Sequence, residues 1–255
     1  MKDILERYEK LSGQSINFTK SVVTFSPNTN RQCRQQICTT LQVQESDLPG
    51  NYLGLPMFIG RRKNNAFKFL TERVSQKLQN WSNKKLSKGG KLVLLKTAAQ
   101  SVPNFWMSLF LIPNEICNEI ERHMNSFWWG SGGSGKGIRW MAWERLCDGK
   151  YNGGLGFRDL KKFNVAMLAK QGWRLINGDN SLVTRLMKAK YYPNNEFIDA
   201  TLGSNPSYVW RSILQPQHVI KQGCRRRIGD GEDTNIWKVP WLPCLQNGYL
   251  TTNSS

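Results

Sequence analysis

Apolar residues recur at the spacing of an α-helix over long stretches of this 255-residue chain. The clearest stretch runs from Asn65 to Asn83, where five side chains fall within one narrow arc of a helical projection: Phe67, Leu70, Val74, Leu78 and Trp81. Similar spacing predicts further helices at 1–12, 31–41, 91–101, 114–129, 159–176, 181–191 and 207–221. The pattern therefore predicts a mainly helical fold, with the 159–176 helix apolar nearly all round and so buried.

Little of the chain has the pattern of a β-strand. Lys20–Phe25 predicts a short strand that stops at Ser26-Pro27-Asn28, and Tyr52–Pro56 predicts an extended segment. Cys224–Trp237 predicts a hairpin that turns at Gly229-Asp230-Gly231. We therefore expect an α+β chain, mainly α with a small β remnant, that ends in a β-hairpin.

The charge of the chain is strongly positive and unevenly distributed. It has 36 Lys and Arg against 18 Asp and Glu, a formal net charge of +18. Residues 51–100 contain eleven basic residues and one acid, Glu72, so +10 of the excess lies in this fifth of the chain. A solvated face is the ordinary explanation of a short charged run, but this density favours a surface that binds phosphates.

Other classes of protein find little support in the sequence. No run is apolar enough to cross a membrane, and the first residues lack the apolar core of a secretory signal, so we expect an intracellular protein without a membrane partner. The six Cys contain no CxxC pair, which favours reduced thiols. Gly130–Gly137 has Gly137 after Lys136, where a P-loop has Ser or Thr, and the segment is typical of a connector between two regions.

Catalytic and metal-binding residues are scarce. His123 lies in an apolar helical stripe, and His218 has no second ligand at a suitable spacing. The acids Asp230, Glu232 and Asp233 cluster in a predicted turn rather than on a strand. Residue chemistry alone therefore predicts a binding surface without a catalytic centre, a metal site or a cofactor.

Tryptophan is abundant, and most of these residues are expected in the core. The ones assigned mostly to the core are Trp81, Trp106, Trp128, Trp129, Trp173 and Trp237. Trp81 stands beside Lys84 and Lys85, so it is the candidate for stacking on a base of a nucleic acid.

Several blocks of sequence resemble reverse transcriptases of plant-type non-LTR (LINE-like) retroelements. They appear in the order of that family along nearly the whole chain: LERYEKLSGQSINFTKS (5–21), YLGLP (52–56), WSNKKLSKGGKLVL (81–94), Pro103-x2-Trp106, FWWG (127–130), GGLGF (153–157) and WKVPWLP (237–243). Each block alone is weak, but together they are specific.

The resemblance implies roles for particular residues. Lys20 matches the lysine of polymerase motif D, which is proposed to protonate departing pyrophosphate, although a plain surface lysine explains it equally well. Tyr52-Leu53-Gly54 matches the primer grip, and the basic helices match the thumb, which holds a duplex by its phosphates. The implied nucleic-acid-binding residues are Tyr52, Leu53, Gly54, Arg61, Arg62, Lys63, Arg73, Lys77, Trp81, Lys84, Lys85, Lys88 and Lys91.

The same resemblance divides the chain into three parts. They are a palm-edge remnant at 1–56, a basic thumb-like region at 57–130, and a Gly-rich linker with a helical post-thumb region at 131–255. The catalytic Asp-Asp box and the ribonuclease H domain of the family have no counterpart in these residues. Mg²⁺ is therefore expected only in a full-length parent polymerase, and whether this chain is an enzyme stays open.

The resemblance implies a truncated fragment that binds primer–template RNA or DNA with little sequence preference but does not polymerise alone. Two alternatives remain. One is a non-catalytic, general RNA- or DNA-binding protein, and the other is a pseudogene product without a selected function. Charge reversal at Lys84, Lys85, Lys88 and Lys91 is expected to weaken binding.

Overall fold

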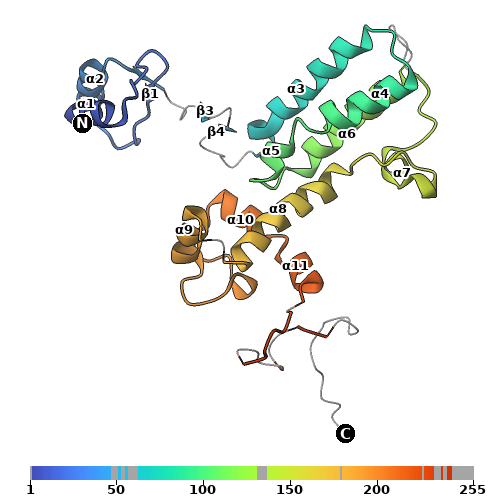
Figure 1. The fold of residues 1–255 in the computed structure, drawn as a ribbon. Helices are drawn as coiled ribbons and strands as arrows, with labels where there is room; N and C mark the ends of the chain where they lie inside the picture. Colours follow the sequence, from blue (N-terminus) through green and yellow to red (C-terminus); the bar gives the residue numbers. More distant parts are fainter. Residues whose placement is uncertain are drawn as a thin grey trace. The chain divides into compact units, whose positions relative to one another are not determined.

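The structure is a computed structural model. It describes residues 2–46, 51–52, 55–56, 63–130, 137–178, 180–225, 227–232, 237 and 240–242. The chain forms two compact units, Met1–Ala66 and Phe67–Ser255, and each is described by itself (Figure 1). Helices dominate the described residues, and the strands form two short two-stranded sheets. The expected mainly helical fold with a small β remnant is therefore confirmed. The expected three-part division stays a prediction.

The first unit is built from short elements. They are α1 (Lys2–Ser12), β1 (Val22–Val23), α2 (Arg31–Leu41), β2 (Gln44–Glu45), β3 (Asn51–Tyr52) and β4 (Leu55–Pro56). β1 pairs with β2 in parallel, and β3 pairs with β4 antiparallel. The Asn30 side chain caps α2 by accepting from the backbone N–H of Gln32. Arg34 joins α2 to β2 through a 2.9 Å ion pair with Glu45.

The second unit is helical. Its elements are α3 (Lys63–Ser82), α4 (Lys88–Leu94), a π-helical turn (Leu95–Ala99), α5 (Asn104–Met107), α6 (Asn114–Trp129), α7 (Trp143–Cys147), α8 (Leu160–Ile176), α9 (Leu182–Tyr191), α10 (Tyr208–Leu214) and α11 (Gln217–Gly223). Short 3-10 helices cover Lys150–Asn152 and Phe197–Asp199. α4 packs against α6, and α8 contacts α5, α6, α10 and α11 (Figure 1).

The apolar stripe of α3 is buried as its spacing predicts. Phe67, Leu70 and Val74 are fully buried, and Leu78 is nearly so. The Phe67 ring meets the Phe110 ring edge-on at 5.8 Å, which ties α3 to the turn after α5. The polar side of α3 is thereby held facing outward.

A second core lies between α8 and the C-terminal helices. Trp210 is fully buried and stacks on Tyr191 with the ring centroids 4.6 Å apart. Gly172 of α8 allows the close approach of these elements, since a Cβ there would lie 2.7 Å from Ile220 Cδ1 and 2.9 Å from Phe197 Cε1. The packing of this core therefore depends on a residue without a side chain at this position.

Asn164 of α8 is the polar centre of the second unit. It is only 1% exposed. Its Oδ1 accepts from the backbone N–H of Ile112 at 2.8 Å, and its Nδ2 donates to the carbonyls of Met107 and Phe110 at 2.8 and 2.9 Å. One amide thus satisfies three backbone groups of the turn that leads from α5 to α6.

Some expectations about helices and tryptophans were wrong. The helix expected at 207–221 is two helices, because Pro216 separates α10 from α11 and has no N–H to continue the ladder. α8 is buried on one side only, and its Trp173 is 44% exposed. Trp237 is also exposed, whereas Trp106 and Trp128 lie in the core as expected.

The hairpin expected at the C-terminal end is not seen where the structure describes the chain. Residues 229–232 form a bend and turn, and Gly231 has a φ of +88°, which suits a glycine. The described residues from 224 to 232 contain no strand, and the second arm lies largely outside the described residues.

Candidate nucleic-acid interface

Four exposed cations follow the outer side of α3 and the loop after it. Arg73 and Lys77 lie one turn apart on the helix, and Lys84 and Lys85 lie in the loop that leads to α4. None of the four makes an ion pair with any residue that the structure describes. We call this set of Arg73, Lys77, Lys84 and Lys85 the basic α3 face. Such unpaired cations are able to bind phosphates without reading base sequence.

Two other predicted contacts, Lys88 and Lys91, turn away from this face toward the C-terminus of α6. The Lys88 ammonium donates to the carbonyl of Trp128 at 3.0 Å and lies 5.1 Å from the centre of its ring. The Lys91 ammonium donates to the carbonyls of Phe127, at 3.1 Å, and Gly130. These carbonyls end a helix and lack partners within it, so the two lysines act as caps.

Lys91 is buried, with 8% of its surface exposed. Burial lowers the pKa of its ammonium below the usual 10.5, and the nearby Lys88 charge lowers it further. A cation in this position supports the junction of α4 and α6 and does not present its charge to a ligand. We therefore leave Lys91 out of the proposed phosphate contacts.

Replacing this buried lysine, in Lys91→Met, is expected to lower the free energy of unfolding by about 1–3 kcal/mol at neutral pH, because one buried and one partly buried carbonyl lose their donor. The lowered pKa adds a pH dependence. As pH rises from the folded-state pKa of Lys91 toward 10.5, the folded state releases its proton before the unfolded state does. The stability of the wild type should therefore rise relative to the variant over this alkaline range.

Urea unfolding at several pH values measures both effects. The matched control is Lys85→Met, the same change at an exposed position, which should alter stability by no more than about 0.5 kcal/mol. Equal stability of the two variants would contradict the capping role of Lys91.

The other predicted binding residues are less clearly grouped. Trp81 is half-buried, and its ring lies 6.2 Å from that of Phe127, so it is partly used in packing. Lys63 is exposed at the start of α3. Lys20 is exposed in a turn, where its backbone N–H donates to Asn17 Oδ1.

The predicted primer-grip residues are only partly covered by the structure. Tyr52 ends β3, which pairs with β4 across a two-residue connection. Leu53, Gly54, Arg61 and Arg62 lie outside the described residues. The role of this segment stays a prediction.

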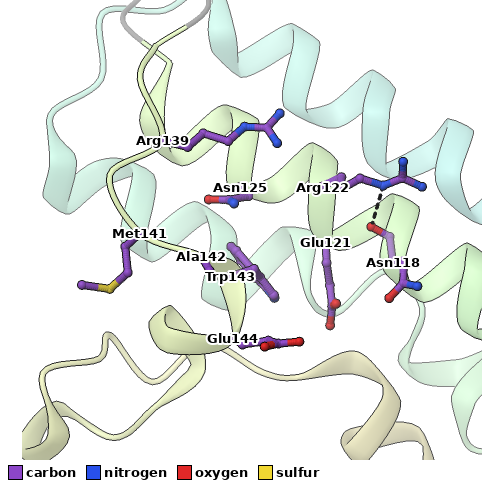
Figure 2. Close-up of a pocket in the computed structure, with 9 residues that line it drawn as sticks. All are labelled: Asn118, Glu121, Arg122, Asn125, Arg139, Met141, Ala142, Trp143 and Glu144. Carbon is purple, nitrogen blue, oxygen red and sulfur yellow. Dashed lines mark hydrogen bonds between the residues drawn. The ribbon is translucent and has the colours of Figure 1, made fainter.

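A pocket that the sequence did not indicate lies between α6 and the segment leading into α7. Its volume is about 700 Å³. It is lined by Asn118, Glu121, Arg122, Asn125, Arg139, Met141, Ala142, Trp143 and Glu144 (Figure 2). These residues are separated in sequence and share no motif, so only the packing of α7 beside α6 brings them together.

The carboxylate of Glu121 has a structural partner in this pocket. Its Oε1 accepts from the backbone N–H of Leu160 at 2.8 Å, at the start of α8, where Asp159 caps the next two N–H groups. Burial raises the pKa of Glu121, while the hydrogen bond from Leu160 acts in the opposite direction. Glu121 therefore holds the start of α8 against α6.

Metal-ligand clusters and membrane spans are not found where the structure describes the chain. In this part, no three His, Cys, Asp or Glu side chains lie together in a way that could hold a metal ion. Among the described helices, none has both the length and the apolar character needed to cross a bilayer.

Comparison with known proteins shows two relatives. A protein of Arabidopsis thaliana named "Uncharacterized mitochondrial protein AtMg00310" is 39% identical over 143 residues, which are 56% of this chain and 93% of that protein. The chain belongs to the AtMg00310 family. No model of a protein family matches it.

The second relative is much longer. The Arabidopsis thaliana "Putative ribonuclease H protein At1g65750" is 33% identical over 207 residues, which are 78% of this chain and 33% of that protein. This member of the AtMg00310 family thus spans about a third of the longer relative. Relatives of these two kinds fit a transposon-derived protein.

Proposed function

We propose that this chain is a reverse-transcriptase-derived retroelement fragment that binds primer–template nucleic acid through the basic α3 face and does not polymerise alone. The observation that carries the proposal is the set of four exposed cations without an ion pair among the described residues, on α3 and in the loop after it, with the opposite side of α3 buried in a core. The family order of the sequence blocks and the ribonuclease H name of the longer relative support it.

Physical chemistry favours a sequence-tolerant clamp. From Lys63 to Lys96 the chain has nine basic residues and one acid, Glu72. Lysines and arginines that contact phosphates position a duplex but carry no direct sequence information. The packing of α3 through Phe67, against the turn that Asn164 holds, supports the helix backbone that carries Arg73 and Lys77.

A matching pair of assays tests the proposal on the full chain. Binding to a labelled primer–template should weaken linearly in a plot of log K against log salt, with a slope of about −4 for four phosphate contacts. Nucleotide addition to the primer in the presence of Mg²⁺ should be absent. Mg²⁺-dependent extension of the primer by this chain alone would contradict the proposal that it does not polymerise. Binding that does not depend on salt would contradict the proposal that the basic α3 face holds the phosphates.

A general RNA- or DNA-binding protein is the second candidate. It is favoured by the same four cations, because none of them distinguishes a primer end from any other duplex. Equal affinities for a duplex with a recessed 3′ end and a blunt duplex would support this candidate. A preference for the recessed end would support the proposal that the chain binds primer–template. A chain without a cooperative thermal transition in circular dichroism would instead support a pseudogene product.

A further inference from the structure

The pocket between α6 and α7 has its charges on opposite sides. Figure 2 shows the guanidinium groups of Arg122 and Arg139 toward the upper side and the carboxylates of Glu121 and Glu144 toward the lower side. Among the described residues, neither arginine is in an ion pair: Arg122 donates to the carbonyl of Asn118, and Arg139 to Ser126 Oγ at 2.6 Å. Both guanidinium groups keep further N–H donors that are able to bind an anion.

The inner part of the pocket combines an aromatic surface with a polar amide. Trp143 is buried, and its indole stacks on Phe157 with the centroids 4.8 Å apart, so its position is firmly held. Asn125 is only 7% exposed, and its Oδ1 has no hydrogen-bond partner among the described residues. An unpaired buried acceptor is costly, and a ligand with an N–H donor is able to satisfy it.

The chain segment that lines one side of this pocket carries an exposed tryptophan. Trp140 is 77% exposed and lies between Arg139 and Met141, which both line the pocket. A large aromatic side chain left in solvent next to a cation is the arrangement by which proteins stack an unpaired base and hold its phosphate. A pocket of about 700 Å³ is large enough for one nucleotide.

We propose that this pocket and Trp140 bind an unpaired stretch of a nucleic-acid strand. One nucleotide enters the pocket with its phosphate toward Arg122 and Arg139 and its base toward Asn125, and the neighbouring base stacks on Trp140. The inference deepens the proposed nucleic-acid function by adding a single-strand site to the duplex-binding basic α3 face. The pocket residues lie outside the set that the sequence predicted.

The test measures binding of the full chain to a fluorescein-labelled single strand of about a dozen nucleotides, a length within the range of known single-strand sites. Trp140→Ala should raise the Kd about tenfold. The matched control is Trp173→Ala, which removes another exposed tryptophan, on α8 and not in the segment 139–144 that lines the pocket. This control should leave the Kd within about twofold of the wild type. Arg122→Gln should weaken binding and reduce the steepness of the salt dependence by about one.

Two further arms separate this inference from the proposed function. A blunt duplex should bind Trp140→Ala and the wild type equally, because the duplex is held by the basic α3 face. A free mononucleotide should bind far more weakly than the strand. Equal single-strand affinities of Trp140→Ala and Trp173→Ala would overturn the inference, as would a mononucleotide that binds as tightly as the strand. Neither result would change duplex binding, so the proposed function is decided by the duplex experiments alone.

Discussion

Reversing the charge of the whole basic α3 face, with Arg73→Glu, Lys77→Glu, Lys84→Glu and Lys85→Glu together, is expected to weaken duplex binding about a thousandfold at low salt. Each cation that contacts a phosphate releases a counterion, so the loss of four contacts should flatten the salt slope by about four. Fluorescence anisotropy with a labelled duplex at several salt concentrations measures both quantities.

A control with the same change in net charge separates this surface from the overall field of the protein. Arg185→Glu, Lys188→Glu, Lys170→Glu and Lys221→Glu together also replace one exposed arginine and three exposed lysines. Each set of four reversals lowers the formal net charge by eight, from +18 to +10. The control should lose affinity only because the long-range attraction between protein and duplex is weaker, an effect that salt screens. It should keep most of the slope of log K against log salt.

Equal losses of affinity in the two variants would refute a localised phosphate-binding surface and leave only non-specific attraction to a basic protein.

The residues chosen for this charge reversal differ from those that the sequence alone suggested. Lys88 and Lys91 were expected in this surface, but both donate hydrogen bonds to carbonyls at the end of α6. Reversing their charge would therefore also disturb the fold.

Removing the buried amide of the second unit, in Asn164→Ala, is expected to lower the free energy of unfolding by about 3–5 kcal/mol. The N–H of Ile112 and the carbonyls of Met107 and Phe110 would lose their partner in a place where water does not reach them. Urea unfolding followed by circular dichroism measures the loss.

Two companion variants make this prediction specific. Asn177→Ala, at an exposed position after α8, should cost no more than about 0.5 kcal/mol. Asn164→Asp keeps an oxygen for the N–H of Ile112 but has no amide donor for the two carbonyls, so it should also be strongly destabilised. Full stability of Asn164→Asp would contradict the donor role of this side chain.

Much of the helical framework was predictable because apolar spacing is a local property. The stripe from Phe67 to Leu78 predicted both α3 and its buried side, and the patterns at 31–41 and 114–129 matched α2 and α6 in their bounds. The patterns were less informative for α8, because its overall apolar composition hid the fact that Trp173 and Arg174 face solvent.

The candidate sites depended more on packing. The pocket between α6 and the segment leading into α7 combines residues from 118 to 144 that have no common spacing, so no pattern could have revealed it. The neighbouring pair Arg139-Trp140 is the one local signal, and it becomes informative only once the tryptophan is known to be exposed.

The sequence by itself determined that the chain is mainly helical and that its positive charge is concentrated in residues 51–100, and several of its blocks resemble those of a retroelement family. Only the tertiary structure decided which cations are available to a ligand. Lys84 and Lys85 stay in solvent, whereas Lys91, a few residues later, is buried against the carbonyl end of α6. Lys88 is still exposed, but its ammonium donates to a carbonyl at the same helix end. The physical reason is that the end of a helix carries unpaired acceptors and a partial negative charge, and a lysine packed against it neutralises both.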